Sequence, residues 1–280
     1  MLEVIDKGSC SEEHPAPLLF VHGAWHAAWC WDEHFLDYFA DKCYRALAVS
    51  LRGHGNSPAP KRMQTCSVAD FVNDVDSVAN SLPTRPVVVG HSMGGFVVQK
   101  YLETHDAPAG VLVASMPTRG AGGFMLRGMK RHPWHAIRLA ITARSLHGYN
   151  TPKLAREYFY SPHTPESDVV RYAARLEEEF VGRSTRDMAL LDLPKPERVT
   201  APLLVLGAEC DGCFTQEEVR ATARAYRTEA EIFPNMGHNM MIEPGWEAVA
   251  QRIHTWLETL APHDSPVNRS KSPTSRYIMG

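Results

Sequence analysis

A serine between glycines is the residue of this chain best suited to nucleophilic chemistry. Gly90-His91-Ser92-Met93-Gly94 fits the pattern G-x-S-x-G, directly after an apolar run and directly before an amphipathic helical pattern. In this strand–turn–helix setting the glycines leave room for a sharp turn, and the serine projects from the sheet edge. The N–H groups that open the following helix favour developing negative charge. We therefore predict that Ser92 is a nucleophile.

Such a serine needs a base and donors for an oxyanion. Of the 14 histidines, His238 has the most suitable position, because it follows the last predicted strand and precedes the final helix. Upstream, His22-Gly23 ends another predicted strand. The backbone N–H of Ala24 could therefore join that of Met93 in an oxyanion hole.

The stretch GAECDGCF, residues 207–214, has two incompatible interpretations. Cys210 and Cys213 form a C-x-x-C pair, which is typical of a metal site or a redox dithiol, and Asp211 between them could orient a histidine. Structural zinc would need two further Cys or His ligands at partner spacing, and the sequence has no second C-x-x-C. A redox dithiol would need the pair at a helix N-terminus in its own fold.

Apolar runs alternate with helical patterns along most of the chain. They predict buried parallel strands at Leu18–Val21, Ala46–Val49, Pro86–Val89, Gly110–Val113, Pro202–Leu206 and Ala230–Phe233. Ser67 with Asp70, and Thr215 with Glu218, have the spacing of helix caps. We expect an open parallel sheet with helices on both faces.

One interval breaks the alternation. Residues 120–200 contain helical patterns and no convincing strand, and one of these helices is predicted to have Thr164 as its N-cap and Pro165 as its first residue. We interpret this block as a helical cap inserted into a core made of residues 1–119 and 201–260. Residues 261–280 are polar and rich in Ser and Pro, so we expect a disordered tail.

Composition excludes several classes of protein. A chain of 280 residues with 44% hydrophobic and 22% charged residues is typical of one large globular enzyme domain, and a net charge of −3 gives no indication of nucleic-acid binding. The start lacks the features of a secretory signal, and no apolar window predicts a transmembrane helix. Six irregularly spaced cysteines then favour reduced thiols in a cytoplasmic protein.

Charge is segregated in the first part of the cap. Residues 107–156 hold eight Lys or Arg and no Asp or Glu, interspersed with apolar residues at helical spacing. A basic amphipathic surface could steer acidic substrates or make weak contact with anionic lipid. The alternative is a solvated positive face balanced by acidic residues elsewhere.

Taken in order, these motifs resemble the α/β-hydrolase superfamily over about residues 15–260. The resemblance rests on HGAW at 22–25, RGHGNS at 52–57, GHSMGG at 90–95, the loop 207–215 and MGH at 236–238. The segment VHGAWHAAWCW is also similar to plant methyl esterases and hydroxynitrile lyases. Those lyases usually carry Thr at the position of Gly23 and Lys at that of Asn239, so both departures favour ester hydrolysis. A serine nucleophile argues against epoxide hydrolases and dehalogenases, whose elbows carry Asp.

The resemblance also implies an acid in the loop after the strand that follows the cap, often as D-x-x-x-P. Asp211 to Thr215 keeps that spacing with Thr in place of Pro, and Glu209 is the only rival. No Asp or Glu lies between Asp106 and Glu157, where some relatives place the acid. We therefore assign Asp211 as the triad acid and interpret the C-x-x-C spacing as accidental, with no metal.

Together the residues predict a serine esterase acting on a small or medium ester. His238 would deprotonate Ser92, Asp211 would orient His238, and no cofactor is required. We expect Trp25, Trp134 and Phe159 to contact the substrate. A lyase, a cofactor-free oxygenase or a ligand receptor on the same scaffold remain alternatives, and the sequence gives no oligomeric state.

Overall fold

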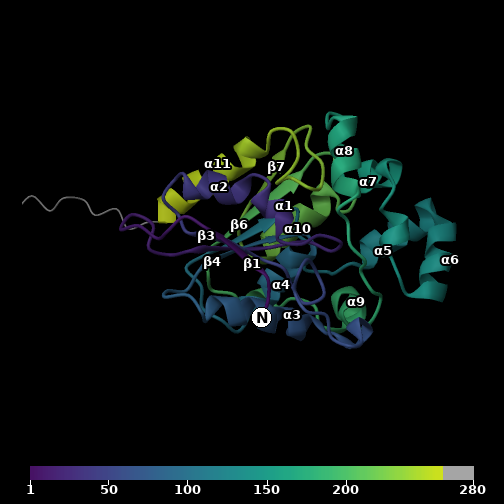
Figure 1. The fold of residues 1–280 in the computed structure, drawn as a ribbon, viewed down its shortest axis with the longest axis horizontal. Coiled ribbons are helices and arrows are strands. Elements are labelled where there is room, and N and C mark those ends of the chain that lie inside the picture. The colour runs from purple at the N-terminus through teal and green to yellow at the C-terminus, as the bar shows by residue number, and fades with distance from the viewer. Residues whose placement is uncertain (261–280) are drawn as a thin grey trace, which may run out of the picture.

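A seven-stranded sheet forms the centre of the molecule (Figure 1), as seen in a computed structural model that describes residues 1–260. The strands are β1 (Val4–Lys7), β2 (Leu18–Val21), β3 (Ala46–Val49), β4 (Val87–His91), β5 (Gly110–Val113), β6 (Leu203–Ala208) and β7 (Ala230–Phe233). Their order across the sheet is β1-β3-β2-β4-β5-β6-β7. All neighbours are parallel except β1, which pairs antiparallel with β3. The predicted parallel sheet is confirmed, and the predicted tail lies outside the described residues.

Helices cover both faces of the sheet. The helices are α1 (Trp29–Asp32), α2 (Phe35–Ala40), α3 (Val68–Ala79), α4 (Met93–Tyr101), α5 (Gly122–Arg131), α6 (Pro133–Thr142), α7 (Pro152–Phe159), α8 (Glu166–Ala173), α9 (Arg183–Arg186), α10 (Gln216–Ala225) and α11 (Trp246–Leu260). In Figure 1, α1, α2 and α11 lie on one side of the sheet, and α3 and α4 lie on the other. Helices α5 to α9 follow β5 and occupy one end of the molecule. Within residues 1–260, no helix is both long and apolar enough to cross a bilayer.

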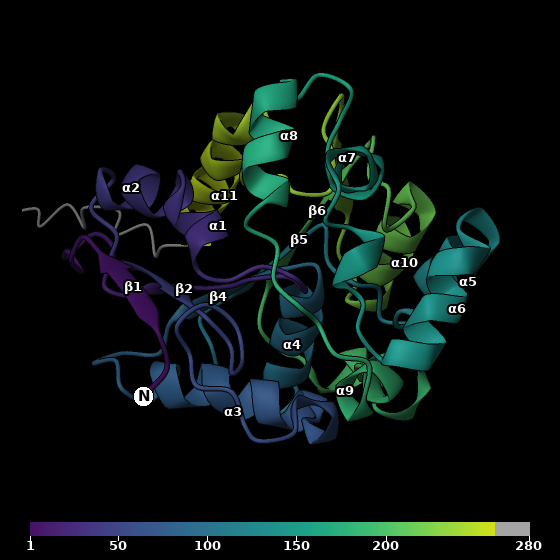
Figure 2. The ribbon, with the colours of Figure 1, turned by 45° about the vertical axis from the view of Figure 1, so that its right-hand side comes forward.

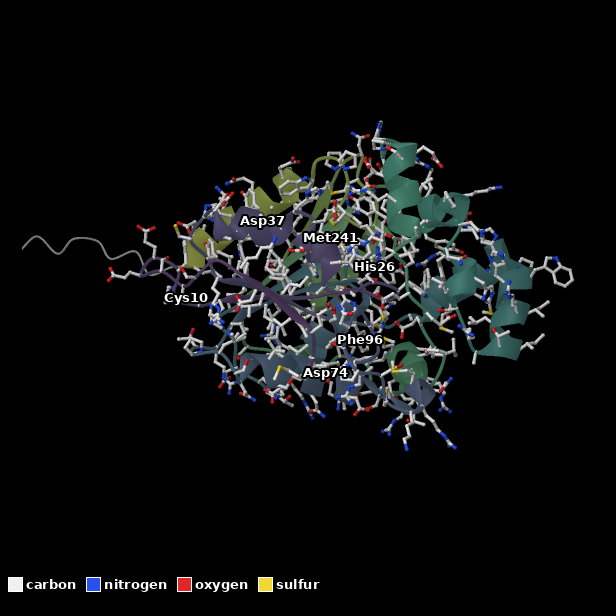
Figure 3. The ribbon with its side chains drawn as sticks, viewed as in Figure 1. Cys10, His26, Asp37, Asp74, Phe96 and Met241 are labelled. Carbon is white, nitrogen blue, oxygen red and sulfur yellow. The ribbon has the colours of Figure 1, made fainter. Side chains whose placement is uncertain are left out.

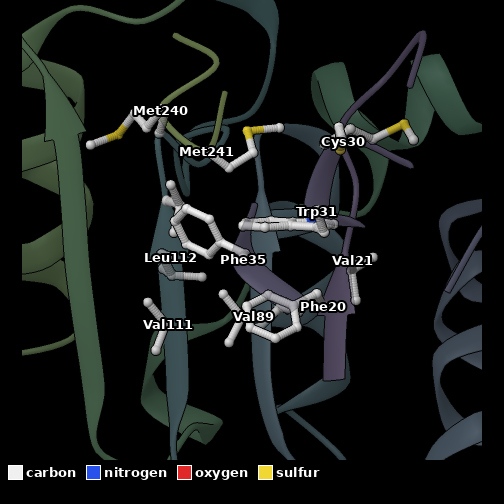
Figure 4. Packing of buried hydrophobic residues seen from close by; sticks show 14 of the residues in the cluster. Phe20, Val21, Cys30, Trp31, Phe35, Val89, Val111, Leu112, Met240 and Met241 are labelled. Carbon is white, nitrogen blue, oxygen red and sulfur yellow. The ribbon is translucent and has the colours of Figure 1, made fainter. Parts of the chain in front are cut away.

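The core forms where the apolar strands meet α1 and α2. Figure 4 shows Trp31 and Phe35 packed over Phe20 and Val89, and the rings of Phe20 and Trp31 are 5.0 Å apart. All four side chains are fully buried. The five inner strands, β2 to β6, are buried throughout because helices cover both faces, which explains why they form continuous apolar runs.

The predicted caps at Ser67 and Thr215 are confirmed. Ser67 accepts a hydrogen bond from the Asp70 N–H while the Asp70 carboxylate accepts one from the Ser67 N–H, and Thr215 and Glu218 form the same reciprocal pair. The third predicted helix also forms, but it begins one residue later than expected: α8 starts at Glu166 with Pro165, not Thr164, as its N-cap.

Thr164 instead helps to anchor the cap to the core through Glu243. The Thr164 hydroxyl and the Ser161 N–H, at 3.0 Å, both donate to Glu243 Oε1. Glu243 Oε2 accepts the Gly237 N–H at 2.9 Å, next to His238. Glu243 is 1% exposed, so one buried carboxylate joins the helical block to the loop that carries the predicted base.

We predict that Glu243→Gln lowers the free energy of unfolding by about 2 kcal/mol, because an amide NH₂ would replace an acceptor that faces N–H or O–H donors. Denaturant unfolding measures the change. Glu247→Gln, an exposed position at the start of α11, should shift it by less than about 0.5 kcal/mol. Equal unfolding curves for both variants would contradict the anchor.

Candidate active site

The turn between β4 and α4 holds Ser92 in a strained conformation. Its φ is 52° and its ψ is −117°, a region that residues with a side chain rarely adopt. A Cβ on Gly90 would lie 2.4 Å from the Gly94 carbonyl oxygen, and one on Gly94 would lie 2.4 Å from the carbonyl oxygens of Val21 and His22. Larger residues would therefore push α4 away from the strands. The turn has the form of a nucleophile elbow.

His238 and Asp211 meet at the same edge of the sheet. His238 Nδ1 is 2.8 Å from Asp211 Oδ2, and both side chains are at most 2% exposed. The other Asp211 oxygen accepts the N–H groups of Cys213 at 2.7 Å and Phe214 at 3.0 Å. The carboxylate is thus fixed by its own loop, and with Nδ1 bonded to it, the imidazole keeps Nε2 for another partner.

His91, the residue before Ser92, contacts His238. The ring of His91 is 4.7 Å from that of His238, and His91 Nε2 donates to the His238 carbonyl oxygen at 3.0 Å. Among the hydrogen bonds of residues 1–260, none joins the Ser92 hydroxyl to His238. Catalytic hydrogen bonds are often long without substrate, so the arrangement is compatible with proton transfer.

The two predicted oxyanion donors lie close to Ser92 along the chain and in space. Met93 directly follows it, and a Cβ on Gly23, next to Ala24, would lie 2.9 Å from Ser92 Cβ. Ala24 and Met93 both line a cavity, whereas Ser92, Asp211 and His238 are not among the residues that line it. In the described part of the chain, neither backbone N–H donates to a protein acceptor. Met93 is also the first residue of α4, where helix N–H groups have no intrahelical partner. These two N–H groups are therefore available to an oxyanion.

The cavity extends from these donors to the inner faces of α5 and α6. Its volume is about 400 Å³, within the range of small-molecule sites. Trp25 lines it with a positive φ of 63°, and its indole N–H donates to the Ser145 hydroxyl at 2.7 Å. Phe159 lies behind the lining, 1% exposed, with its ring 6.1 Å from that of His238. It supports the base rather than lining the cavity.

The structure does not bring Trp134 to the cavity. This side chain is 78% exposed and is not among the residues that line the cavity. The neighbouring His135 lines it instead, because α6 turns that face inward. Sequence reasoning also missed other lining residues, contributed mostly by the cap: Met116, Phe124, Gly128, His132, Tyr149, Tyr158, Glu179 and Met188.

A possible metal-binding group overlaps the pair of His238 and Asp211. Together with Cys213 they offer ligand atoms within 4.8 Å of one another, the one such group of three or more found in residues 1–260. A metal would need the Cys213 thiolate and would displace the hydrogen bond at His238 Nδ1. Burial raises the pKa of Cys213 well above its ordinary value, so the chemistry of this donor set favours the protonated, hydrogen-bonded form. Cys210 is not part of the group.

A buried histidine supports the loop of Ala24. His26 Nδ1 donates to the Ala24 carbonyl oxygen at 2.8 Å, and its Nε2 accepts from Asn239 Nδ2 at 3.1 Å. This pattern requires the neutral ring. Burial lowers the pKa of His26 to about 4, and the nearby His238 and His54 act in the same direction. Asn239, fully buried, also donates to the Tyr160 hydroxyl at 3.2 Å.

Glu177 and Glu179 tie the cap to core loops around the cavity, and Glu178 between them joins two parts of the cap. The Glu177 N–H donates to the Trp25 carbonyl oxygen at 2.8 Å, and Glu179 Oε2 is 2.9 Å from His54 Nε2. Burial alone would lower the pKa of His54, but the charge of Glu179 and its hydrogen bond outweigh burial and raise it. Glu178 accepts the Ser145 N–H at 2.8 Å. This acidic strap therefore fixes one wall of the site.

Comparison with known proteins identifies the family. The sequence profile described as "Alpha/beta hydrolase family" matches residues 18–252. The chain belongs to this family. The hydrolase is 27% identical over 236 residues to Monoacylglycerol lipase of Mycolicibacterium smegmatis, covering 75% of this chain and 76% of the relative. It is 29% identical over 127 residues to Methylesterase 10 of Arabidopsis thaliana, covering 39% and 46%.

Further matches are shorter or more distant. The hydrolase is 30% identical over 113 residues to Epoxide hydrolase 1 of Caenorhabditis elegans, covering 40% of this chain but only 27% of that protein. Its fold is similar to that of a thermophilic esterase from Thermogutta terrifontis, with a TM-score of 0.73 and 19% identity over 93% of this chain and 94% of the other. The expected resemblance to the superfamily and its esterase-type members is confirmed.

We predict that the hydrolase loses stability in acid partly through His26. The unfolded ring binds a proton below about pH 6.5, whereas the folded ring does so only below about pH 4. The free energy of unfolding should therefore fall between these pH values, by about 3 kcal/mol for this residue. His26→Gln, which does not titrate, should reduce the fall by that amount in denaturant titrations at several pH values. The exposed His163→Gln serves as control, and an unchanged pH dependence in His26→Gln would contradict the assignment.

Proposed function

We propose that the hydrolase cleaves a carboxylic ester of small or medium size through an acyl-enzyme formed on Ser92. One observation carries the proposal: the hydrogen-bonded pair of Asp211 and His238 lies at the sheet edge from which the strained elbow presents Ser92. The names of relatives, an esterase and a lipase among them, support the same reaction class.

The residues divide the reaction between them. His238 Nε2 accepts the proton of Ser92 as the serine oxygen bonds to the ester carbonyl carbon, and the carbonyl oxygen becomes negative between the N–H groups of Ala24 and Met93. The imidazolium then donates its proton to the departing alkoxide, which leaves as the alcohol. A water molecule, deprotonated by His238, attacks the acyl-enzyme in the same way and releases the acid. Asp211 stabilises the imidazolium in both halves.

The surroundings of Ser92 favour an ester over a cyanohydrin. The cavity next to the oxyanion donors is lined mostly by apolar side chains, which suits an acyl or alcohol chain. A Cβ on Gly23 would lie 2.9 Å from Ser92 Cβ and 2.8 Å from His91 Nδ1. This site therefore has no room for the threonine of the lyases. Asn239, where the lyases carry lysine, is committed to His26 and Tyr160.

The test of the proposal is covalent labelling. Ser92→Ala should abolish labelling by a fluorophosphonate and lower kcat for a short soluble ester at least about 10⁴-fold, because the nucleophile is lost. Ser115→Ala removes another buried serine near α4 and should keep the labelling, which mass spectrometry can assign to a residue. Labelling of the Ser92→Ala protein at wild-type level would show that another residue is the nucleophile.

A second experiment separates the roles of Asp211 and the cysteines. Asp211→Asn should lower kcat by about 10⁴-fold, the loss expected when the orienting carboxylate is removed. Cys210→Ser with Cys213→Ser should leave kcat within about threefold, because neither thiol takes part in acyl transfer, and chelators should have no effect on the wild type. Inactivation by a chelator would reinstate a metal site. Near-normal activity of Asp211→Asn would direct the search for the acid to Glu209.

A further inference from the structure

Helices α5 and α6 have apolar side chains on two opposite faces. Their inner faces, which include Met125 and Leu139, line the cavity. Their outer face carries Leu126, Trp134, Ile137 and Ile141, exposed by 49%, 78%, 50% and 79%. The last three follow an i, i+3, i+7 spacing, which places them on one side of α6.

Exposed apolar side chains of this size are concentrated at this one site. Within residues 1–260, ten large hydrophobic side chains are exposed, and five of them belong to α5 and α6. Single exposed apolar residues are ordinary, but a contiguous group on one surface marks an interaction site. Met129 also lines the cavity, so internal packing accounts for part of its surface. It does not account for the other four, Leu126, Trp134, Ile137 and Ile141, which are not among the residues that line the cavity.

The charges around this surface are positive and partly unpaired. Four of the basic residues in segment 107–156 are balanced by glutamates, in the pairs Arg127–Glu218, Arg131–Glu157, Arg144–Glu178 and Arg156–Glu166. For these four residues the alternative of a solvated positive face balanced by acidic residues therefore holds. Lys130 and Arg138, both exposed, make no ion pair within the described part of the chain. Lys130 is one turn from Leu126, and Arg138 one turn from Trp134.

This surface also stands at the end of the molecule. In Figures 1 and 2, α5 and α6 project beyond the body of the sheet at the side opposite α2. In Figure 3 the buried residue His26 lies nearer the centre of the molecule than these helices do. A flat surface can therefore touch the outer face of α5 and α6 without meeting the core.

We propose that the docking face, formed by Leu126, Lys130, Trp134, Ile137, Arg138 and Ile141, binds the surface of an anionic lipid bilayer. Apolar side chains with an exposed tryptophan enter the interfacial region, and the two free cations pair with lipid phosphates. Because the inner faces of the same helices line the cavity, bound lipid lies next to the wall of the substrate site. The substrate class is then an ester held in or partitioned into such a surface, a step that rests on the proposed function.

A second copy of the chain fits this face less well. A symmetric dimer would bring the same patch of both copies together, so Lys130 and Arg138 of one copy would approach the cations of the other. No acidic residue of segment 107–156 could offset that repulsion. An anionic bilayer supplies the opposite charge over the whole contact area.

Binding can be tested without turnover, using Ser92→Ala protein and co-sedimentation with vesicles of phosphatidylglycerol or phosphatidylcholine. We expect the protein to bind phosphatidylglycerol vesicles with an affinity at least about tenfold higher than its affinity for phosphatidylcholine vesicles. Raising salt from about 0.1 M to about 0.5 M should weaken it, because exposed charges become screened. Tryptophan emission should shift to the blue on binding, and Trp134→Phe should remove most of that shift, since Trp134 is the most exposed tryptophan in residues 1–260.

Two double variants test the two components of the face. Trp134→Ser with Ile141→Ser, and Lys130→Glu with Arg138→Glu, should each weaken binding to phosphatidylglycerol at least about tenfold. Val170→Ser on α8 and Lys61→Glu in the loop before α3 change an exposed apolar and an exposed basic residue elsewhere, and should leave binding unchanged. The same substitutions in protein with the native Ser92 should keep turnover of a short soluble ester, which verifies folding.

Absence of binding to phosphatidylglycerol, or equal binding by both double variants and the controls, would overturn the proposal. So would a concentration-dependent dimer that Trp134→Ser with Ile141→Ser abolishes in ultracentrifugation while vesicles remain unbound. Vesicle binding by a protein that hydrolyses no ester would retain the docking face and reject the proposed reaction, so the two failures are distinguishable.

Discussion

Close backbone contact at the turn from β4 into α4 is the constraint on which the site depends. Gly94 approaches the carbonyl groups at the end of β2, and Gly90 approaches Gly94 itself, at distances that leave no room for a Cβ. The first turn of α4 is therefore pressed against the neighbouring strand. Ser92 then has to project from the sheet edge with a positive φ, and the loop after β2 brings the Ala24 N–H to the same place.

Neutral histidines fill the space around the predicted base. Burial lowers the pKa of His26 to about 4 and that of His91 well below its ordinary value. Both rings act as hydrogen-bond linkers, His26 to the Ala24 carbonyl and His91 to that of His238. An imidazolium formed on His238 would thus have uncharged rings beside it and Asp211 as its counter-charge. Additional cations there would disfavour its protonation.

Local sequence patterns predicted the parts of the site that depend on short-range geometry. Ser92, Asp211 and His238 each follow a strand, and parallel strands bring their carboxyl ends to one edge, so their proximity follows from order along the chain. Strand β1 was not predicted, because its four residues, at the edge of the sheet, do not form a continuous apolar run. The sequence could not predict which face of α6 lines the cavity. Helical periodicity places Trp134 and His135 on different faces but does not indicate which of them points inward. That choice depends on long-range packing of the cap, as does the use of Thr164 as a partner of Glu243.

The cap is attached unevenly, and this has an evolutionary consequence. Its parts near Glu243 and the acidic strap are tied to the core by buried hydrogen bonds, so most substitutions there would disturb the loops of His238 and Trp25. Within residues 1–260, the side chains of α6 form no hydrogen bond or ion pair with the core. Changes in α6 can therefore accumulate with little effect on the triad. Among related chains that accept different substrates, the sequence differences should be concentrated in this one helix. The hydrogen-bonded anchors should stay constant.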